Sequence, residues 1–225
     1  MDAAAQDGLR LELIGDAPQG AADATGLSAD GRSSYYAQRL VRTRRSKKGR
    51  RRRSKHKKTP TNLPRRARRT QRYKLPKWPK VSGMIHTQSH LILAAVFTEG
   101  PSHDSPDLPG LMRQTAARVK LDRLLADSGY DAEAHHVLGR ETLGIRSTLI
   151  ALNPRNHGRR WPLEKYRRQM KTCPQRRKYA QRSQAESVWS RHKRRFGWVL
   201  ATKTSPRQVH ECQFKVMLHN ITILA

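Results

Sequence analysis

The segment VSGMIHTQSHLILAAVFT, residues 81–98, contains two apolar runs that are rich in β-forming residues. The runs span residues 81–87 and 91–98, and they are separated by Gln88-Ser89-His90. Two such runs joined by a short connection predict an antiparallel β-hairpin. Gly100-Pro101 breaks the second run, so the hairpin is expected to end there.

Strand and helix patterns alternate around this hairpin. An apolar run that stops at Gly26 predicts an earlier strand near residues 21–26. After the hairpin, strands are predicted at residues 121–126 and 147–152, and helices at about residues 111–119, 132–143, 179–196 and 208–221. The basic stretch 155–178 contains Pro162 and Pro174, and we expect a loop with at most one helical turn there. An early hairpin followed by strand–helix units indicates an α/β fold, a mixed sheet flanked by helices.

The charge of the chain is large and unevenly distributed. Its 225 residues include 47 Lys and Arg against 17 Asp and Glu, a formal net charge of +30, and the sequence pI is about 11.4. Residues 39–80 carry twenty-one of the basic residues and no acidic residue, whereas residues 1–38 carry six acids and two bases. A chain this basic is typical of proteins that bind a polyanion, and nucleic acid is the partner that we expect.

Residues 39–80 form the most basic segment, and four prolines interrupt it. Repulsion between like charges disfavours a long helix, as do the prolines, so we expect a flexible arm inserted between the first two strands. The core then spans residues 20–225, after a poorly defined segment 1–19. The candidate phosphate contacts of the arm are Arg50, Arg51, Arg52 and Arg53, with an affinity that falls as salt rises. A solvated low-complexity insertion and a basic address signal are the alternatives.

Composition excludes several classes of protein. The longest apolar run, residues 91–97, is far shorter than the ~20 residues of a membrane-spanning helix, which excludes a membrane protein. The acidic N-terminus lacks the apolar core of a secretory signal, and we expect a cytoplasmic, nucleoid-associated protein. Cys173 and Cys212 are too few for a disulfide framework or, by themselves, for a zinc site.

Three carboxylates stand out among the few acidic residues. Asp23 and Asp127 each come at or near the end of an apolar strand, where open α/β sheets bind ligands. Glu186 lies within the predicted helix 179–196. Enzymes that cut phosphodiesters usually hold hard divalent metal ions with carboxylates. Each residue also has a structural alternative: Asp23 as a turn cap, Asp127 as a helix N-cap, and Glu186 as the i,i−4 partner of Arg182.

The helix 179–196 contains the spacing Tyr-x2-Arg-x3-Glu-x6-Lys, formed by Tyr179, Arg182, Glu186 and Lys193. These residues fall at i, i+3, i+7 and i+14, and therefore on one helical face. The pattern resembles the signature around the third acidic residue of bacterial insertion-sequence transposases of the DDE class. Residues 23–27 and 126–133 resemble the blocks around the first and second aspartates of that family, in the same order.

The resemblance implies an RNase H-like fold and a DDE transposase that cleaves and transfers DNA strands. It implies that the catalytic residues are Asp23, Asp127 and Glu186, and that they hold two Mg²⁺ or Mn²⁺ ions for the attack of water and the departure of the 3′-oxygen. The other signature residues, expected to contact DNA, are Tyr179, Arg182 and Lys193. The implied partners are the terminal repeats of the element and the target DNA, with a homodimer in the synaptic complex.

The match departs from complete family members at the N-terminus. Such transposases usually carry an additional helical region that recognises the ends of the element, and here Asp23 comes almost at the start. We therefore expect a truncated catalytic core. The alternatives are a catalytically inactive remnant that only binds nucleic acid, and a basic ribonucleoprotein component whose acidic residues are incidental.

Overall fold

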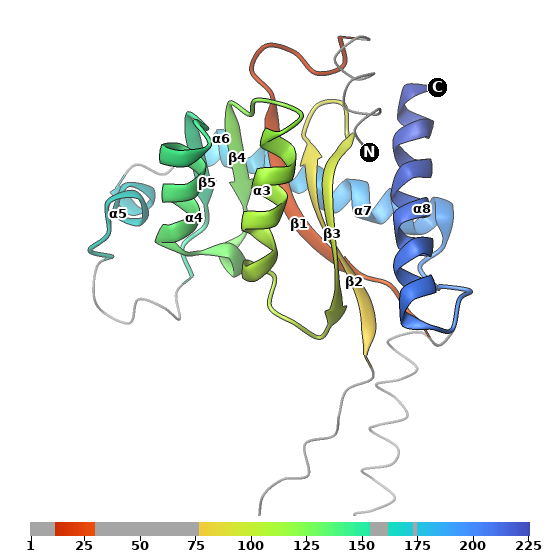
Figure 1. The fold of residues 1–225 in the computed structure, drawn as a ribbon. Helices are drawn as coiled ribbons and strands as arrows, with labels where there is room; N and C mark the ends of the chain where they lie inside the picture. Colours follow the sequence, from red (N-terminus) through yellow and green to blue (C-terminus); the bar gives the residue numbers. More distant parts are fainter. Residues whose placement is uncertain (1–11, 30–76, 154–161, 173–174) are drawn as a thin grey trace, which may run out of the picture.

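The computed structural model describes residues 12–29, 77–153, 162–172 and 175–225. Within these residues, the centre is a five-stranded sheet with the order β3-β2-β1-β4-β5 (Figure 1). β1–β2 and β2–β3 are antiparallel pairs, whereas β1–β4 and β4–β5 are parallel. The strands are β1 (Gln19–Gly26), β2 (Trp78–His86), β3 (Ile92–Gly100), β4 (Arg123–Ala126) and β5 (Ser147–Ile150). The sheet is mixed, as predicted.

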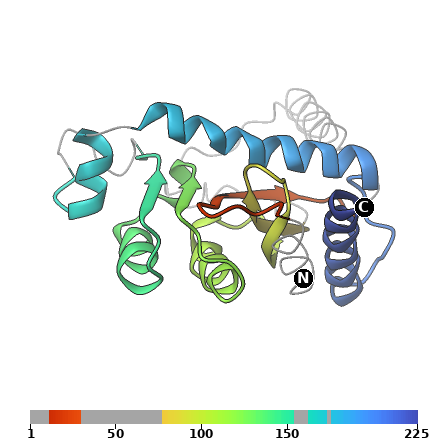
Figure 2. The same cartoon turned by 90° about the horizontal axis from the view of Figure 1, so that it is seen from above.

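Helices cover both faces of the sheet. In the described ranges the α-helices are α3 (Leu108–Ala116), α4 (Glu133–Val137), α5 (Lys165–Thr172), α6 (Arg176–Tyr179), α7 (Ser183–Phe196) and α8 (Ser205–Leu224). The shorter helical turns are η2 (Ser105–Asp107), η3 (Ser128–Tyr130), the π-helical η4 (Leu138–Thr142) and η6 (Ala180–Arg182). α3 and α4 lie on one face, α7 crosses the other, and α8 stands beside β2 and β3 (Figure 2). This arrangement confirms the predicted α/β fold.

The local predictions are mostly confirmed, with one correction. The hairpin of residues 81–98 is β2 and β3, and both later strands lie inside their predicted ranges. The prediction of a loop with at most one helical turn over residues 155–178 was wrong, because the described part contains α5 and α6. Pro162 precedes α5 and Pro174 follows it. The prolines therefore bound this helix, where they do no harm, rather than interrupting it.

Each face of the sheet buries its own apolar cluster. On β1, Ala22 packs with α3 in one cluster, whereas Ala21 packs with α7 in the other. On β4, Leu124 joins the cluster of α3 and Leu125 the cluster of α7. Because side chains of a strand alternate between faces, every second residue after Ala21 and Leu125 points toward α7.

The edge strand β3 is completed by α8. The side chain of Asn220 accepts the N–H of Ile92 at 2.9 Å and donates to its carbonyl oxygen at 2.9 Å. His219 donates from Nε2 to the carbonyl oxygen of His90 at 3.0 Å. These bonds replace part of a neighbouring strand, which protects the edge from pairing with another chain.

The remaining sequence predictions concern membrane insertion and the basic arm. None of the helices in the described ranges combines the length and the apolar character that a bilayer span requires. Of the predicted arm of residues 39–80, residues 39–76 lie outside the described residues, whereas residues 78–80 form the start of β2. The predicted phosphate contacts Arg50, Arg51, Arg52 and Arg53 lie outside the described residues as well.

Candidate active site

Asp23 and Asp127 lie side by side where β1 passes the end of β4. The parallel register pairs Ala22 with Ala126, so the next residue on each segment is an aspartate. Neighbouring strands are about 4.8 Å apart, and Asp127 continues β4 in an extended conformation. Each aspartate comes two residues after a side chain that packs toward α7. Both carboxylates therefore belong to the face of the sheet that α7 covers.

Glu186 approaches the same face from the first turn of α7. Ala185, Val188 and Trp189 form the buried side of this helix and pack on the sheet. α7 contacts β1 along this side. Glu186 is at the margin of the contact, with a side chain that is 56% exposed.

Burial and neighbouring charges both act on the pKa of Asp23. Burial raises the pKa of Asp23 from 3.8 to about 6. The backbone N–H of Ala24 and the charge of Arg182 oppose this shift, whereas the negative charges of Asp127 and Glu186 add to it. The strand register and the contact of α7 with β1 place Asp23, Asp127 and Glu186 on the same side of the sheet, and we call these three residues the carboxylate cluster.

The other residues of the signature lie around this cluster. Arg182 donates to Oε1 of Glu186 at 2.5 Å. Lys193 is half-buried, and burial lowers its pKa while the charge of Asp23 opposes that change. Tyr179 is also half-buried, and burial raises its pKa. Tyr179 lies in α6, Arg182 in η6, and Glu186 and Lys193 in α7, so the signature extends over three consecutive helical segments. The contact of these residues with DNA stays a prediction.

Two of the carboxylates also make the structural contacts considered from the sequence. Asp127 accepts the backbone N–H of Gly129 at 2.7 Å and caps η3. Glu186 forms an i,i+4 ion pair with Arg182. Within the described parts of the chain, no three His, Cys, Asp or Glu side chains converge as ligands of one metal ion. A shared metal therefore requires Glu186 to turn from Arg182 toward the aspartates.

The chemistry of the cluster suits a hard divalent cation. Mg²⁺ prefers oxygen ligands, keeps several waters and is bound by only a few carboxylates. A cation would also stabilise the charged form of Asp23, which burial disfavours. The residues that would hold it are Asp23, Asp127 and Glu186.

Gly83 sets how closely α7 packs beside Asp23. It is the β2 partner of Asp23 in the antiparallel register, and a Cβ at this position would lie 2.7 Å from Cζ2 of Trp189. Trp189 is buried and follows Glu186 by three residues on α7. Its ring fills the space that a side chain at residue 83 would take. This contact between Trp189 and Gly83 was not visible in the sequence.

Changing Gly83 to Ala is therefore expected to displace α7 and to lower DNA cleavage about a hundred-fold, since a shift of about 1 Å in an active site costs that much. Adding Trp189→Phe should restore activity, because Phe lacks the ring atoms that meet the new Cβ. Gel assays of cleavage measure both effects. Gly15→Ala is the control, because a Cβ at Gly15 meets nothing within 4 Å. Undiminished cleavage by the Gly83→Ala protein would show that this spacing is unimportant.

Changing Asp23 to Asn is expected to stabilise the metal-free protein at neutral pH. The folded pKa of about 6 lies above the ordinary 3.8, so folding takes up a proton between these values and stability falls as the pH rises through them. Asn removes this cost, on the order of 2 kcal/mol at about pH 7 and close to zero near pH 4. Urea unfolding in EDTA at both pH values measures the difference. If Asp23→Asn changes the free energy of unfolding equally at both pH values, the raised pKa of Asp23 is not the cause.

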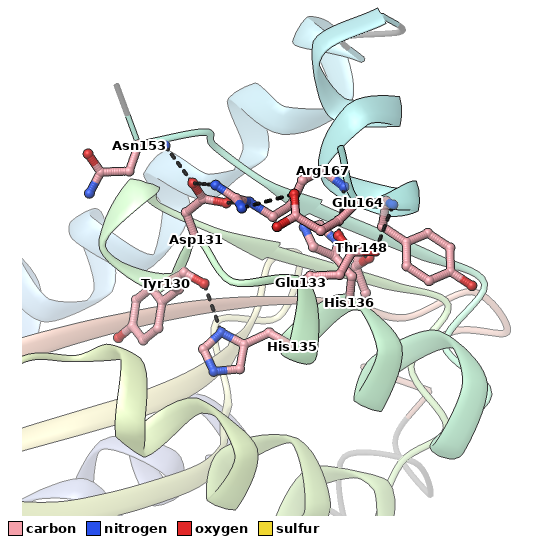
Figure 3. A network of polar contacts seen from close by, with 10 residues as sticks. Tyr130, Asp131, Glu133, His135, His136, Thr148, Asn153, Glu164 and Arg167 are labelled. Atoms are coloured by element: carbon pink, nitrogen blue, oxygen red, sulfur yellow. Dashed lines mark hydrogen bonds and ion pairs between the residues drawn. The ribbon is translucent and has the colours of Figure 1, made fainter. Parts of the chain in front are cut away.

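A buried ion pair holds the chain that follows Asp127 (Figure 3). The side chain of Asp131 is 0% exposed and accepts from Arg167 at 2.9 Å, and it also accepts the backbone N–H of Asn153 at 2.9 Å. Glu133 accepts two backbone N–H groups from the first turn of α5, at 2.9 and 3.0 Å. These bonds fix α5 to the segment that begins at Asp127. Sequence reasoning missed α5, although residues 163–172 contain neither Gly nor Pro.

Comparison with known proteins gives one family match. A family model described as the transposase DDE domain matches residues 15–221. This range includes the three carboxylates and the three other signature residues described above. Searches of curated proteins and of solved structures found no significant match.

Proposed function

The chain belongs to the transposase DDE domain family, and on this basis we propose that it cleaves DNA strands at the ends of an insertion sequence and transfers them to target DNA. Such proteins carry out phosphoryl transfer on DNA. One observation carries the proposal for this chain, namely that the β1–β4 register places Asp23 beside Asp127 on the face of the sheet where α7, with Glu186 in its first turn, contacts β1. The spacing from Tyr179 to Lys193 supports assignment to the Tyr-Arg-Glu-Lys type.

We assign metal binding to Asp23, Asp127 and Glu186. When bound, two Mg²⁺ or Mn²⁺ ions supply charge stabilisation for the attacking and leaving oxygens of the phosphodiester. The burial that raises the pKa of Asp23 also limits access of water to this part of the cluster. The three carboxylates would hold the ions, and the positive side chains of Arg182 and Lys193 would orient the phosphate.

Arg182 contributes both to metal binding by the carboxylates and to binding of the DNA phosphate. In the structure it donates to Glu186 at 2.5 Å, so it neutralises a carboxylate that would otherwise repel the aspartates. If Glu186 turned to a metal ion, Arg182 would be available to a DNA phosphate, with which a guanidinium can form two parallel hydrogen bonds. Lys193, on the same helical face, supplies a second positive charge beside Asp23.

The partners proposed are the terminal repeats of the element and the target DNA, bound by a homodimer in the bacterial nucleoid. The alternative is an inactive remnant that binds nucleic acid without cutting it. The observation that favours this alternative is the present orientation of Glu186, which is paired with Arg182.

Cleavage of plasmid DNA that carries the terminal repeats separates the two possibilities. With Mg²⁺ or Mn²⁺, the full chain is expected to produce nicks with 3′-OH ends at the repeat boundaries, and EDTA should abolish them. A plasmid with scrambled repeats controls for contaminating nucleases. DNA binding without cleavage in either metal would identify the inactive remnant.

A further inference from the structure

Helices α5 and α6 expose a strongly basic surface near the carboxylate cluster. Residues 165–178 contain seven Lys or Arg and no Asp or Glu. The exposed bases are Lys165, Arg168, Lys171, Arg176, Arg177 and Lys178. A charge run is often no more than a solvated face, so its orientation and its position relative to the site decide what it can bind.

Arg167 fixes the orientation of α5. Its side chain is only 12% exposed and pairs with the buried carboxylate of Asp131. On the same inner side, Tyr166 is buried and Met170 packs against the apolar cluster of α7. The bases left on the outer side are Lys165, Arg168 and Lys171, which at i, i+3 and i+6 share one helical face.

α6 leads from this surface into the site. α6, η6 and α7 follow one another directly over residues 176–196, and Figure 2 shows them as successive turns of one rod. A rise of about 1.5 Å per residue places Arg176 about 15 Å from Glu186 along this rod. That length corresponds to roughly four nucleotide steps of about 3.4 Å on one DNA strand.

We infer that the outer surface of α5 and α6 binds the phosphate backbone of the DNA strand that enters the carboxylate cluster. The inference rests on the proposed function for the identity of the partner, and it adds a contact surface beyond the signature residues. Lys and Arg on a helix exterior suit phosphate contacts, which position DNA without reading its sequence. Among the described residues of α5 and α6, none exposes a large apolar side chain. The two helices themselves therefore offer no large apolar anchor to a protein partner, although Leu163, two residues before α5, is exposed.

DNA binding in EDTA tests this surface independently of cleavage. The variant Arg168→Gln/Arg176→Gln/Arg177→Gln removes three exposed charges from it. We expect the slope of log affinity against log salt to fall by about 2–3, at roughly 0.9 per lost phosphate contact. The loss should be equal for terminal-repeat and unrelated DNA. Fluorescence anisotropy of labelled duplexes at a series of salt concentrations measures the slope.

A matched variant separates this surface from net charge alone. Arg113→Gln/Lys120→Gln/Arg207→Gln removes the same charge from exposed residues in or next to α3 and α8, and its slope should equal that of the wild type. Equal losses in both variants, or an unchanged slope in the first, would overturn the inference. Competition by poly-glutamate as effective as that of unlabelled DNA would identify a site for acidic protein instead. If the first variant loses DNA binding as expected but the wild-type protein cuts no DNA, the proposed function is rejected and this binding surface still stands.

Discussion

Changing Asp127 to Asn is expected to reduce DNA cleavage roughly a thousand-fold while the protein stays folded, because a metal ligand contributes several kcal/mol to the transition state and each 1.36 kcal/mol is about tenfold in rate. Asn keeps an Oδ1 atom that can accept the N–H of Gly129, now bonded to Asp127 at 2.7 Å. The η3 turn should therefore survive. Cleavage assays show the loss, and circular dichroism shows that the fold is retained.

Glu186→Gln is expected to cause a comparable loss, because it removes the third proposed ligand. Glu99→Gln is the matched control. Glu99 is exposed on β3 and pairs with Lys77 at 2.6 Å, away from the cluster. Wild-type cleavage by the Asp127→Asn protein, or an equal loss in the Glu99→Gln protein, would remove the basis for the catalytic assignment.

Changing Arg167 to Met is expected to lower the free energy of unfolding by about 3–5 kcal/mol, the usual cost of leaving a buried charge without its partner. The side chain of Asp131 is 0% exposed and would keep its charge in a buried place. Domains have unfolding free energies of only about 5–15 kcal/mol, so the loss is severe. Urea denaturation followed by circular dichroism measures it.

The double variant Arg167→Met/Asp131→Asn should recover part of this stability. Asn at residue 131 carries no charge and can still accept the N–H of Asn153, now bonded at 2.9 Å. Arg146→Met is the control, because the Arg146 side chain that pairs with Asp122 is 72% exposed, and exposed pairs contribute little. If Arg146→Met destabilises as much as Arg167→Met, burial is not the reason for the effect.

Much of the sheet and of the candidate site could be predicted from the sequence because their signals are local. The two runs of residues 81–98 and their short connection specify a hairpin without reference to the rest of the chain. The spacing of Tyr179, Arg182, Glu186 and Lys193 specifies one helical face once a helix is assumed. Acidic residues are also scarce in this chain, which made Asp23 and Asp127 conspicuous at the ends of apolar runs.

What could not be predicted depends on contacts between distant segments. The role of Gly83 requires the register that places it opposite Asp23 and beneath Trp189. The inward side of α5 is equally hidden, because Arg167 looks like any other base until it meets Asp131, 36 residues earlier. From composition alone, the basic residues and prolines of segment 155–178 indicated a loop. The ion pair and the capping by Glu133 are what hold the helix there.

Iron-directed cleavage of the polypeptide tests most directly whether Asp23, Asp127 and Glu186 hold divalent ions together. Fe²⁺ that replaces Mg²⁺ at a carboxylate site generates hydroxyl radicals with ascorbate and peroxide, and these cut the backbone nearby. We expect cuts near residues 23, 127 and 186 that excess Mg²⁺ suppresses and that Asp127→Asn removes at all three places. Cuts confined to other segments, or cuts that persist in the Asp127→Asn protein, would contradict a shared metal site.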